Sequence, residues 1–344
     1  MNETIITLEE FFELRKKLPI LDARSESEFE QSHIPKAVNL PILNNEERKT
    51  VGTLYKNSGS EEATLKGFEL VGPRFHIIIK EALILFPEKN IITYCWRGGM
   101  RSQIISWLLT MAGFQVYRLN GGYKTYRSFT FEQVKKPLNL TVIGGKTGSG
   151  KTLILHHLNK MGEAIIDLES IANHKGSSFG GIGLGKQPSV EQFENLLAEE
   201  LILLEGSQNI WVENESRKIG RVILPDSFYH QLITAPLIEI ERSTAERVKH
   251  ITDEYAHLPK EDLKQAVIRI GKKLGGLRLN QALDAIEEGD HSAWVENMLI
   301  YYDKAYTFDI QRHPREKIDI ISMEDKSIEE ACERLLNNKI KPHE

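Results

Sequence analysis

Residues 139–161 read NLTVIGGKTGSGKTLILHHLNKM, an apolar run, a glycine-rich loop and a helical pattern in direct succession. The loop Gly145–Thr152 matches G-x-x-x-x-G-K-[ST], the spacing of a phosphate-binding loop. Asn139–Ile143 reads as a strand and Thr152–Met161 as a helix, which is the context that such a loop requires. The stretch predicts a nucleotide-type P-loop sheet. The alternative, a glycine-rich turn without a ligand, does not account for this context.

Each residue type in this loop has its own predicted role. Glycines let backbone N–H groups converge on phosphate oxygens, the Lys151 ammonium adds positive charge, and the Thr152 hydroxyl is a candidate Mg²⁺ ligand. Two later strands, Ala164–Ile166 and Ile210–Val212, are each followed at once by a carboxylate, and the sequence does not choose between these two as the metal-holding group. The predicted phosphate-binding residues are Gly145, Thr147, Gly148, Ser149, Gly150, Lys151, Thr152, Asp167 and Glu213.

A second loop, residues 95–102, reads CWRGGMRS. Asn90–Tyr94 before it reads as a buried strand, and the apolar spacing within Ser102–Met111 is helical. Cys95 therefore lies at the carboxyl end of a strand and before a helix, where open α/β sheets usually place catalytic groups. Backbone N–H groups and the helix dipole stabilise a thiolate there.

The surroundings of Cys95 favour a reactive thiol over the inert buried cysteine that is common inside cells. Glycines follow it, and Arg97 and Arg101 flank those glycines. A guanidinium matches a tetrahedral oxyanion through paired hydrogen bonds. We predict that Cys95, Arg97 and Arg101, together with Lys151 of the phosphate loop, are the catalytic residues.

The chain of 344 residues is long enough for two domains, since a domain typically holds roughly 100–200 residues. Ile20–Ala23 reads as a strand of the first domain, and short apolar runs alternate with helical patterns throughout. Pro137 resists continuation of a helix or a central strand. We therefore predict domains at residues 1–134 and 138–344.

Composition indicates a globular protein with a net charge of −5 and two cysteines, Cys95 and Cys332, which lack the spacing of a metal site. The first residues are acidic without an apolar signal core, and no apolar run is long enough to span a bilayer. These features predict a cytoplasmic protein without a membrane partner.

The negative net charge does not suggest nucleic-acid binding, but one segment does. Residues 264–278 contain cations and no acid, which predicts a phosphate-binding stripe, with a solvated helix face as the equal alternative. The cations of this stripe are Lys264, Arg269, Lys272, Lys273 and Arg278.

The first domain resembles the rhodanese-like domains. Residues 21–25 (LDARS) and 33–41 (HIPKAVNLP) are similar to their opening signature, and the cysteine loop completes the likeness. The spacing from Cys95 to Arg101 is one residue longer than in simple rhodanese sulfurtransferases and equals that of phosphatases with this fold. A longer loop encircles a larger anion, so a phosphate-like group fits it better.

A rhodanese-like parallel-sheet domain followed by a P-loop NTPase-like α/β domain resembles the tRNA 2-selenouridine synthases over nearly the whole chain. The segments 167–169 (DLE), 174–180 (HKGSSFG), 187–189 (QPS) and 211–217 (WVENESR) are similar to that family's blocks. Lys175 stands where the family leads us to expect arginine; a lysine keeps the charge but loses the bidentate fork.

The resemblance implies a tRNA carrying 2-thiouridine at the wobble position as partner, and two reactions on that base. Geranyl diphosphate first alkylates the sulfur, and selenium from selenophosphate then replaces the geranylated sulfur. No tightly bound cofactor is implied beyond a candidate Mg²⁺. Cys95 either carries selenium or positions selenophosphate, and the sequence leaves both roles open.

Three other functions explain part of the sequence. A P-loop kinase or ATPase with an accessory rhodanese module accounts for the phosphate loop alone. A phosphatase or arsenate-reductase-like enzyme accounts for the cysteine loop alone. A noncatalytic tRNA-binding protein would use both loops only to grip phosphates.

Overall fold

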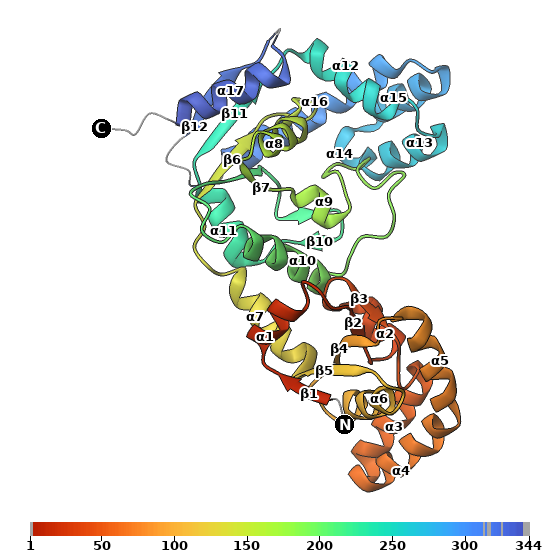
Figure 1. Cartoon of the computed structure of the whole chain (residues 1–344). Helices are drawn as coiled ribbons and strands as arrows, with labels where there is room; N and C mark the ends of the chain where they lie inside the picture. The colour runs from red at the N-terminus through yellow and green to blue at the C-terminus, as the bar shows by residue number, and fades with distance from the viewer. Residues whose placement is uncertain (1–2, 312–313, 315–317, 325, 340–344) are drawn as a thin grey trace. The chain divides into compact units, whose positions relative to one another are not determined.

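The computed structural model of the protein describes residues 3–311, 314, 318–324 and 326–339. The chain divides into two compact units, Met1–Gln133 with Glu194–Leu196, and Val134–Phe193 with Leu197–Glu344. Each unit contains its own parallel sheet with helices on both faces (Figure 1). The predicted fold class, a rhodanese-like domain and a P-loop α/β domain, is confirmed.

The sheet of the first unit has the order β1-β5-β4-β2-β3, and every neighbouring pair is parallel. The central strand β4 alternates its side chains between the faces, as a pleated strand must. Ile91 packs against helices α5 (Phe75–Leu85) and α6 (Met100–Met111). Ile92 packs against α1 (Leu8–Leu14) and α7 (Gly122–Gln133). The strands are β1 (Glu3–Ile6), β2 (Ile20–Asp22), β3 (Ala37–Asn39), β4 (Asn90–Tyr94) and β5 (Gln115–Leu119).

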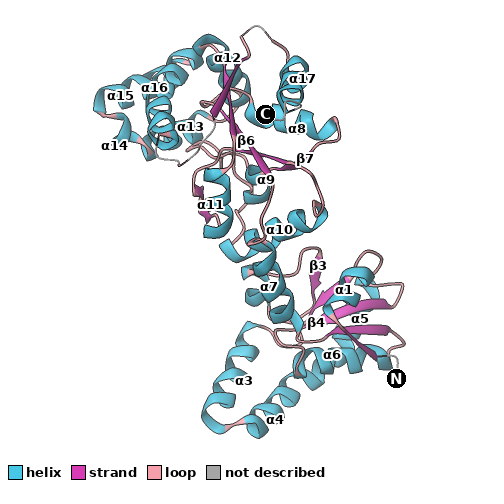
Figure 2. Cartoon of the chain, turned by 90° about the vertical axis from the view of Figure 1, so that its left-hand side faces the viewer, coloured by secondary structure: helices cyan, strands magenta, loops and turns pink. Residues whose placement is uncertain are grey.

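Two helices between β3 and β4 form a hairpin, α3 and α4 (Figure 2). Asn44 begins α3 with a capping box, in which its side chain and that of Glu47 each accept a backbone N–H of the other. Gly59, with φ of 90°, ends α3 and begins α4. The helices are α1 (Leu8–Leu14), α2 (Glu26–Gln31), α3 (Asn45–Ser58), α4 (Ser60–Val71), α5 (Phe75–Leu85), α6 (Met100–Met111) and α7 (Gly122–Gln133), with a 3₁₀ turn at Gly72–Arg74.

A buried ion pair holds the turn after β2. The Arg24 guanidinium contacts the Asp22 carboxylate at 2.6 Å, with both side chains almost fully buried. The Tyr94 hydroxyl donates to the same carboxylate at 2.6 Å, and Arg24 also donates to the carbonyl of Ser32. The two buried charges of this network therefore face each other and further hydrogen-bond partners, which is the condition for burying them.

The sheet of the second unit has the order β12-β11-β6-β8-β7 and is also parallel throughout. Strand β6 lies at its centre, between β11 and β8. Its strands are β6 (Leu140–Gly144), β7 (Ala164–Ile166), β8 (Ile210–Glu213), β11 (Leu237–Glu241) and β12 (Ile318–Ser322), and a small antiparallel hairpin is formed by β9 (Lys218–Ile219) and β10 (Val222–Ile223).

Helices α8 and α17 cover one face of this sheet, and α10 and α11 cover the other (Figure 1). A further apolar core forms among α12 to α16, with Phe179 packed into it. The helices are α8 (Lys151–Lys160), α9 (Leu168–Ala172), α10 (Val190–Leu203), α11 (Asp226–Thr234), α12 (Thr244–Tyr255), α13 (Lys260–Arg269), α14 (Gly271–Leu274), α15 (Gly276–Glu288), α16 (His291–Ile310) and α17 (Ile328–Lys339).

The predicted strands Asn90–Tyr94 and Ala164–Ile166 are present with those bounds. The predicted strand at Asn139–Ile143 is shifted by one residue, and the predicted helix at Ser102–Met111 begins earlier, at Met100. The helix starts directly after the glycine turn, so its first turn contains residues outside the apolar pattern that predicted it.

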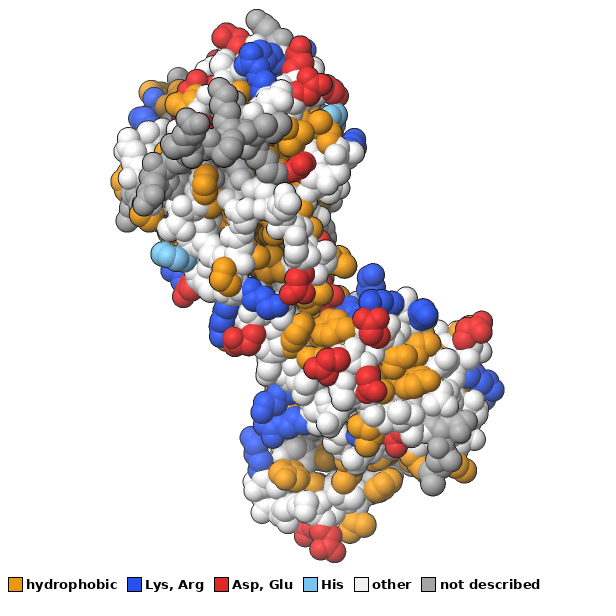
Figure 3. All heavy atoms as spheres, turned by 60° about the vertical axis from the view of Figure 1, so that its left-hand side comes forward, with side chains coloured by type: hydrophobic (Ala, Val, Ile, Leu, Met, Phe, Trp, Pro, Cys, Tyr) orange, Lys and Arg blue, Asp and Glu red, His pale blue; other side chains and the backbone are white. Residues whose placement is uncertain are grey.

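Acidic and basic side chains lie interspersed on the face drawn in Figure 3. The surface shown there has no large area of one sign, which fits the modest net charge. Within the described part of the chain, no helix combines the length and apolar character needed to cross a membrane.

Candidate functional site

Cys95 follows β4 directly, and its buried thiol faces the first turn of α6. The sulfur lies 3.1 Å from the Ser102 hydroxyl and donates to the carbonyl of Gly99 at 3.7 Å. Ser102 in turn donates to the same Gly99 carbonyl at 3.0 Å. The side chain therefore occupies the inside of the loop, at the N-terminal end of the helix.

The first turn of α7, which follows β5, contacts the backbone of the cysteine loop. The backbone N–H of Tyr123 donates to the Cys95 carbonyl at 2.8 Å, and that of Lys124 donates to the Trp96 carbonyl at 2.9 Å. A Cβ atom on Gly122 would lie 2.2 Å from the Cys95 carbonyl oxygen, too close for any side chain. Glycine is required here because the two backbones touch.

The two predicted arginines differ in their surroundings. Arg101 makes a two-point contact with the Glu28 carboxylate, at 2.5 and 3.2 Å, while Arg97 is exposed in the loop. Arg48 also approaches Glu28, at 3.6 Å. Burial raises the pKa of Glu28, but the hydrogen bond and charge of Arg101 outweigh it and hold that pKa below its ordinary value. An anion bound at Arg101 would share its guanidinium with this carboxylate.

The phosphate loop connects β6 to α8 in the second unit. Lys151 donates to the Gly145 carbonyl at 2.9 Å, and the Gly145 N–H donates to the Tyr306 hydroxyl at 2.7 Å. Gly148 and Gly150 have φ values of 82° and 84°, in the left-handed region that favours glycine. The backbone of the predicted loop thus adopts a conformation that its glycines make accessible.

Two arginines from beyond β11 hold carbonyl groups of this loop. Arg242 donates to the Ser149 carbonyl at 3.0 Å, and the buried Arg247 donates to the Thr147 carbonyl at 2.8 Å. Arg247 also forms a two-point ion pair with Asp303 of α16. The loop is therefore fixed by side chains far away in the sequence.

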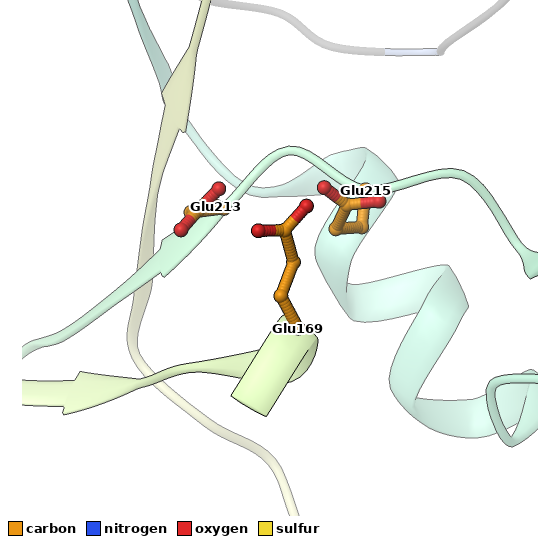
Figure 4. A group of neighbouring side chains, drawn as sticks. All are labelled: Glu169, Glu213 and Glu215. Atoms are coloured by element: carbon orange, nitrogen blue, oxygen red, sulfur yellow. The ribbon is translucent and has the colours of Figure 1, made fainter. Parts of the chain in front are cut away.

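Three carboxylates converge beside the loop, Glu169 from α9, Glu213 from β8 and Glu215 from the segment after β8 (Figure 4). Their nearest oxygen atoms lie within 4.8 Å of one another. Burial and the neighbouring carboxylates raise the pKa of Glu169 to about 9 and that of Glu215 to about 8. Burial also raises the pKa of Glu213, against the charge of Lys151 and a hydrogen bond from Thr152.

One oxygen of Glu213, Oε1, is buried and has no hydrogen-bond partner among the described residues. Asp167, the other carboxylate predicted from the sequence, is engaged in the fold: it caps α9 by accepting the Ser170 N–H at 2.8 Å, and it contacts His156 at 2.5 Å. Glu213 thus has an oxygen free for a ligand in the pocket, whereas Asp167 makes structural contacts.

A pocket of about 730 Å³ joins the phosphate loop and the carboxylates to an apolar wall. This wall comes from the helical core of the unit, where Phe179 stacks on Trp294 with ring centroids 5.3 Å apart. Its main apolar residues are Phe179, Ile251, Tyr255, Trp294, Met298 and Leu299.

Comparison with known proteins gives matches for both units. A family model of the tRNA 2-selenouridine synthase AAA domain matches residues 138–338, and one of the rhodanese-like domain matches residues 7–128. The tRNA 2-selenouridine synthase of Sulfurovum sp. (strain NBC37-1) is 36% identical over 86% of this chain and 89% of its own length. The Nitrosomonas europaea protein of that name is 36% identical with the same coverage, and that of Bdellovibrio bacteriovorus is 33% identical over 87% and 90%.

The chain belongs to the tRNA 2-selenouridine synthase family. This confirms the resemblance noted in the sequence. Lys175, where the family led us to expect arginine, contacts Glu254 at 2.6 Å and lies over the ring of Tyr255. In this family member, both Lys175 and its partners line or border the P-loop pocket.

The predicted phosphate-binding stripe runs over α13, α14 and α15. Lys264 pairs with Glu287 and Glu261, so acids outside the segment neutralise this one of its cations. Arg269 donates to the backbone carbonyl of Ser178 at 2.8 Å. The other members are less constrained, with Lys272 and Lys273 exposed on α14 and Arg278 partly exposed on α15.

Several site residues of this synthase-family chain escaped the sequence analysis. Glu169 lies two positions after the predicted carboxylate Asp167, and Glu215 lies two positions after Glu213. This repeated spacing is the sequence signal that could have identified them. Arg242, Arg247 and Tyr306 gave no signal, because only the fold brings them to the loop. Cys332 packs in the core under α17, where burial raises the pKa of its thiol to about 11.

We expect Glu169→Gln to stabilise the protein above neutral pH. The pKa of Glu169 is raised from 4.5 in the unfolded chain to about 9, so ionisation favours the unfolded state as pH rises through this window. In chelator, the variant's free energy of unfolding should exceed the wild type's by an amount that grows by up to about 1.4 kcal/mol per pH unit as pH rises from 4.5 toward 9, with little difference below pH 4.5. Urea denaturation across pH measures this, with exposed Glu200→Gln as control. An equal gain at both ends of the pH range would contradict the electrostatic cause.

Proposed function

We propose that the protein converts 2-thiouridine at the wobble position of tRNA into 2-selenouridine in two steps, geranylation of the sulfur and its replacement by selenium. One observation carries the first step: the phosphate loop opens into a pocket with an extended apolar wall. A diphosphate and an attached isoprenoid chain require this combination. The name shared by the relatives supports the product.

In the first step, the thiocarbonyl sulfur attacks the allylic carbon of geranyl diphosphate. A carbon–sulfur bond forms, the carbon–oxygen bond to diphosphate breaks, and the proton on N3 of the base passes to solvent. Negative charge accumulates on the diphosphate oxygens as they depart. Lys151 and the backbone N–H groups of the loop stabilise that charge, which is a role for a P-loop without ATP hydrolysis.

The apolar wall would hold the isoprenoid chain during this step. Burial of such a chain contributes about 0.8 kcal/mol for each CH₂ group removed from water. Trp294 and Met298 of α16 and Tyr255 of α12 supply buried apolar surface close to the loop. Binding energy from the chain therefore positions the reacting carbon near the departing diphosphate.

The residues beside the loop also fit a divalent cation. Mg²⁺ prefers oxygen ligands and is usually shared between a few protein groups and substrate phosphates. The Thr152 hydroxyl and the unpartnered Glu213 oxygen are the groups that would hold it. Bound there, the ion would supply positive charge to the diphosphate.

In the second step, selenium from selenophosphate forms a bond to C2 of the base and the carbon–sulfur bond at C2 breaks. Water takes up the phosphoryl group, the phosphorus–selenium bond breaks, and geranylthiol and phosphate are released. Cys95 either carries selenium as a nucleophile or positions selenophosphate. Arg97 and Arg101 would hold the phosphate portion.

We expect Lys151→Ala to abolish geranyl transfer while leaving the fold intact. Removing one group that stabilises developing negative charge typically costs about 10²–10³ in rate. Mass spectrometry of nucleosides after incubation with 2-thiouridine tRNA and geranyl diphosphate measures the product, and exposed Lys160→Ala on the same helix is the control. Normal geranyl transfer by folded Lys151→Ala would remove the P-loop from the mechanism, and ATP turnover without tRNA would favour a kinase or ATPase instead.

Cys95→Ser should separate the two reactions. Geranyl transfer uses a sulfur already present on the tRNA, so it needs no protein thiol, whereas selenium exchange needs a soft nucleophile or activator. The variant should accumulate S-geranyl tRNA and form no 2-selenouridine, as read by the same nucleoside analysis. Cys332→Ala, a change in the core, should retain both reactions. Loss of both reactions by folded Cys95→Ser that still binds tRNA would contradict this division, and retention of both would make Cys95 a bystander.

Reversal of Lys272 and Lys273 to Glu should weaken tRNA binding and flatten its salt dependence. Each lost phosphate contact changes the slope of log K against log salt by roughly 0.9 for a duplex and about 0.7 for a single strand. Filter binding at several salt concentrations measures this, with reversal of the exposed pair Lys16 and Lys17 as control. An unchanged affinity and slope would assign α14 to an ordinary solvated surface.

A further inference from the structure

We propose that an apolar pocket between α3 and α4, beside the cysteine loop, holds the isoprenoid chain of S-geranyl tRNA while selenium replaces the sulfur. This inference rests on the proposed function and adds a second chain-binding site to it. The pocket has a volume of about 660 Å³ and lies entirely within the first unit.

Residues from one face of each helix in the α3–α4 hairpin line this pocket. On α4, Ala63, Gly67 and Val71 recur at helical spacing, and on α3 the corresponding positions include Gly52 and Tyr55. Tyr55 lines the pocket and its side chain is 63% exposed. The hairpin therefore presents apolar surface that its own side chains leave uncovered.

Two glycines keep this space open. Gly52 and Gly67 lie inside helices, where glycine costs about 1 kcal/mol relative to alanine. A Cβ atom on Gly67 would meet nothing within 4 Å, and one on Gly52 would meet only the tip of Arg48, at 3.9 Å. Neither position has a positive φ. Backbone conformation and packing thus give no reason for glycine here, whereas an occupant of the pocket does.

The pocket extends to α6, the helix whose residue Ser102 contacts the Cys95 sulfur. Met100, Arg101 and Ile104 of this helix line it. The Thr64 hydroxyl of α4 contacts the Met100 sulfur at 3.9 Å, which joins the hairpin to the start of α6. A chain seated in the pocket would therefore have its sulfur end near the cysteine loop.

Charge around the pocket indicates what kind of apolar ligand fits. Arg48, Lys49, Lys56 and Arg101 line it, together with no acidic residue. Two of these cations, Arg48 and Arg101, also contact the Glu28 carboxylate. Cations beside an apolar surface suit an isoprenoid attached to an anionic polymer, because phosphates of that polymer meet the cations while the chain enters the pocket. S-geranyl tRNA has this composition.

A site for the isoprenoid chain at this pocket would assist the exchange step. The carbon–sulfur bond at C2 breaks, and the departing geranylthiolate takes up a proton and leaves as geranylthiol. Holding its chain fixes C2 against the thiol and the bound selenophosphate, because an oriented reactant loses less freedom on reaching the transition state. The substrate of the exchange is thereby distinguished from unmodified 2-thiouridine.

Filling the pocket with Gly67→Leu tests this role. Leucine favours a helix over glycine, so the variant should fold at least as stably. We expect selenium exchange on S-geranyl tRNA to fall at least about tenfold, equivalent to 1.4 kcal/mol. Exchange on S-methyl tRNA, and geranyl transfer onto 2-thiouridine tRNA, should be unchanged. Glu62→Leu, on the exposed side of α4, is the matched control and should behave like wild type.

A second measurement reads the pocket without tRNA. Photoreactive diazirine-bearing geraniol should label peptides from residues 45–71 of the wild type, and Gly67→Leu should lose that label. The proposal is overturned if label falls only in the second unit, if Gly67→Leu slows S-methyl and S-geranyl substrates equally, or if wild type exchanges both at the same rate. Failure of the wild type to geranylate tRNA would instead refute the proposed function. Labelling of residues 45–71 by the geraniol probe would in that case still show that the pocket binds an isoprenoid chain.

Discussion

The cysteine loop and the phosphate loop depend on one constraint, the parallel pairing of a central strand with neighbours on each side. β4 lies between β5 and β2, and β6 lies between β11 and β8, so the loops after β4 and β6 begin at the carboxyl edge of a sheet. Each loop then passes directly into a helix, where backbone N–H groups point outward. Anion-binding geometry follows from this topology before any side chain is considered.

The two loops differ in how their surroundings treat charge. At the cysteine loop, Glu28 engages Arg101, so one of the two arginines that follow Cys95 is already paired. At the phosphate loop, Lys151 faces a group of carboxylates that burial makes reluctant to ionise. A cation shared with a substrate would relieve that group, whereas an anion would compete for Arg101.

The fold and the reactive loops were predictable because their signals are local. The phosphate loop and the cysteine loop each combine a short strand, glycines and a helix within a few residues, and glycine positions such as Gly148 and Gly150 reflect backbone requirements alone. The pairing of Arg247 with Asp303 and the meeting of Glu169 with Glu215 join separate elements, and only tertiary packing brings them together. The charge at Lys264 could not be judged from its own segment, since one of the two acids that pair with it, Glu287, lies on another helix.

The hydrogen bond from the Gly145 N–H to Tyr306 links ligand binding to the packing of α16. A phosphate oxygen that takes this N–H must displace the hydroxyl, so the phosphate loop and the last turns of α16 are thermodynamically coupled. Suppose that phosphate binding at the loop changes the affinity of α16 for a second ligand by some factor. That second ligand must then change the affinity of the loop for phosphate by the same factor. Because α16 belongs to the helical core that includes α14 and α15, a macromolecule engaging that core would adjust the occupancy of the loop without touching it.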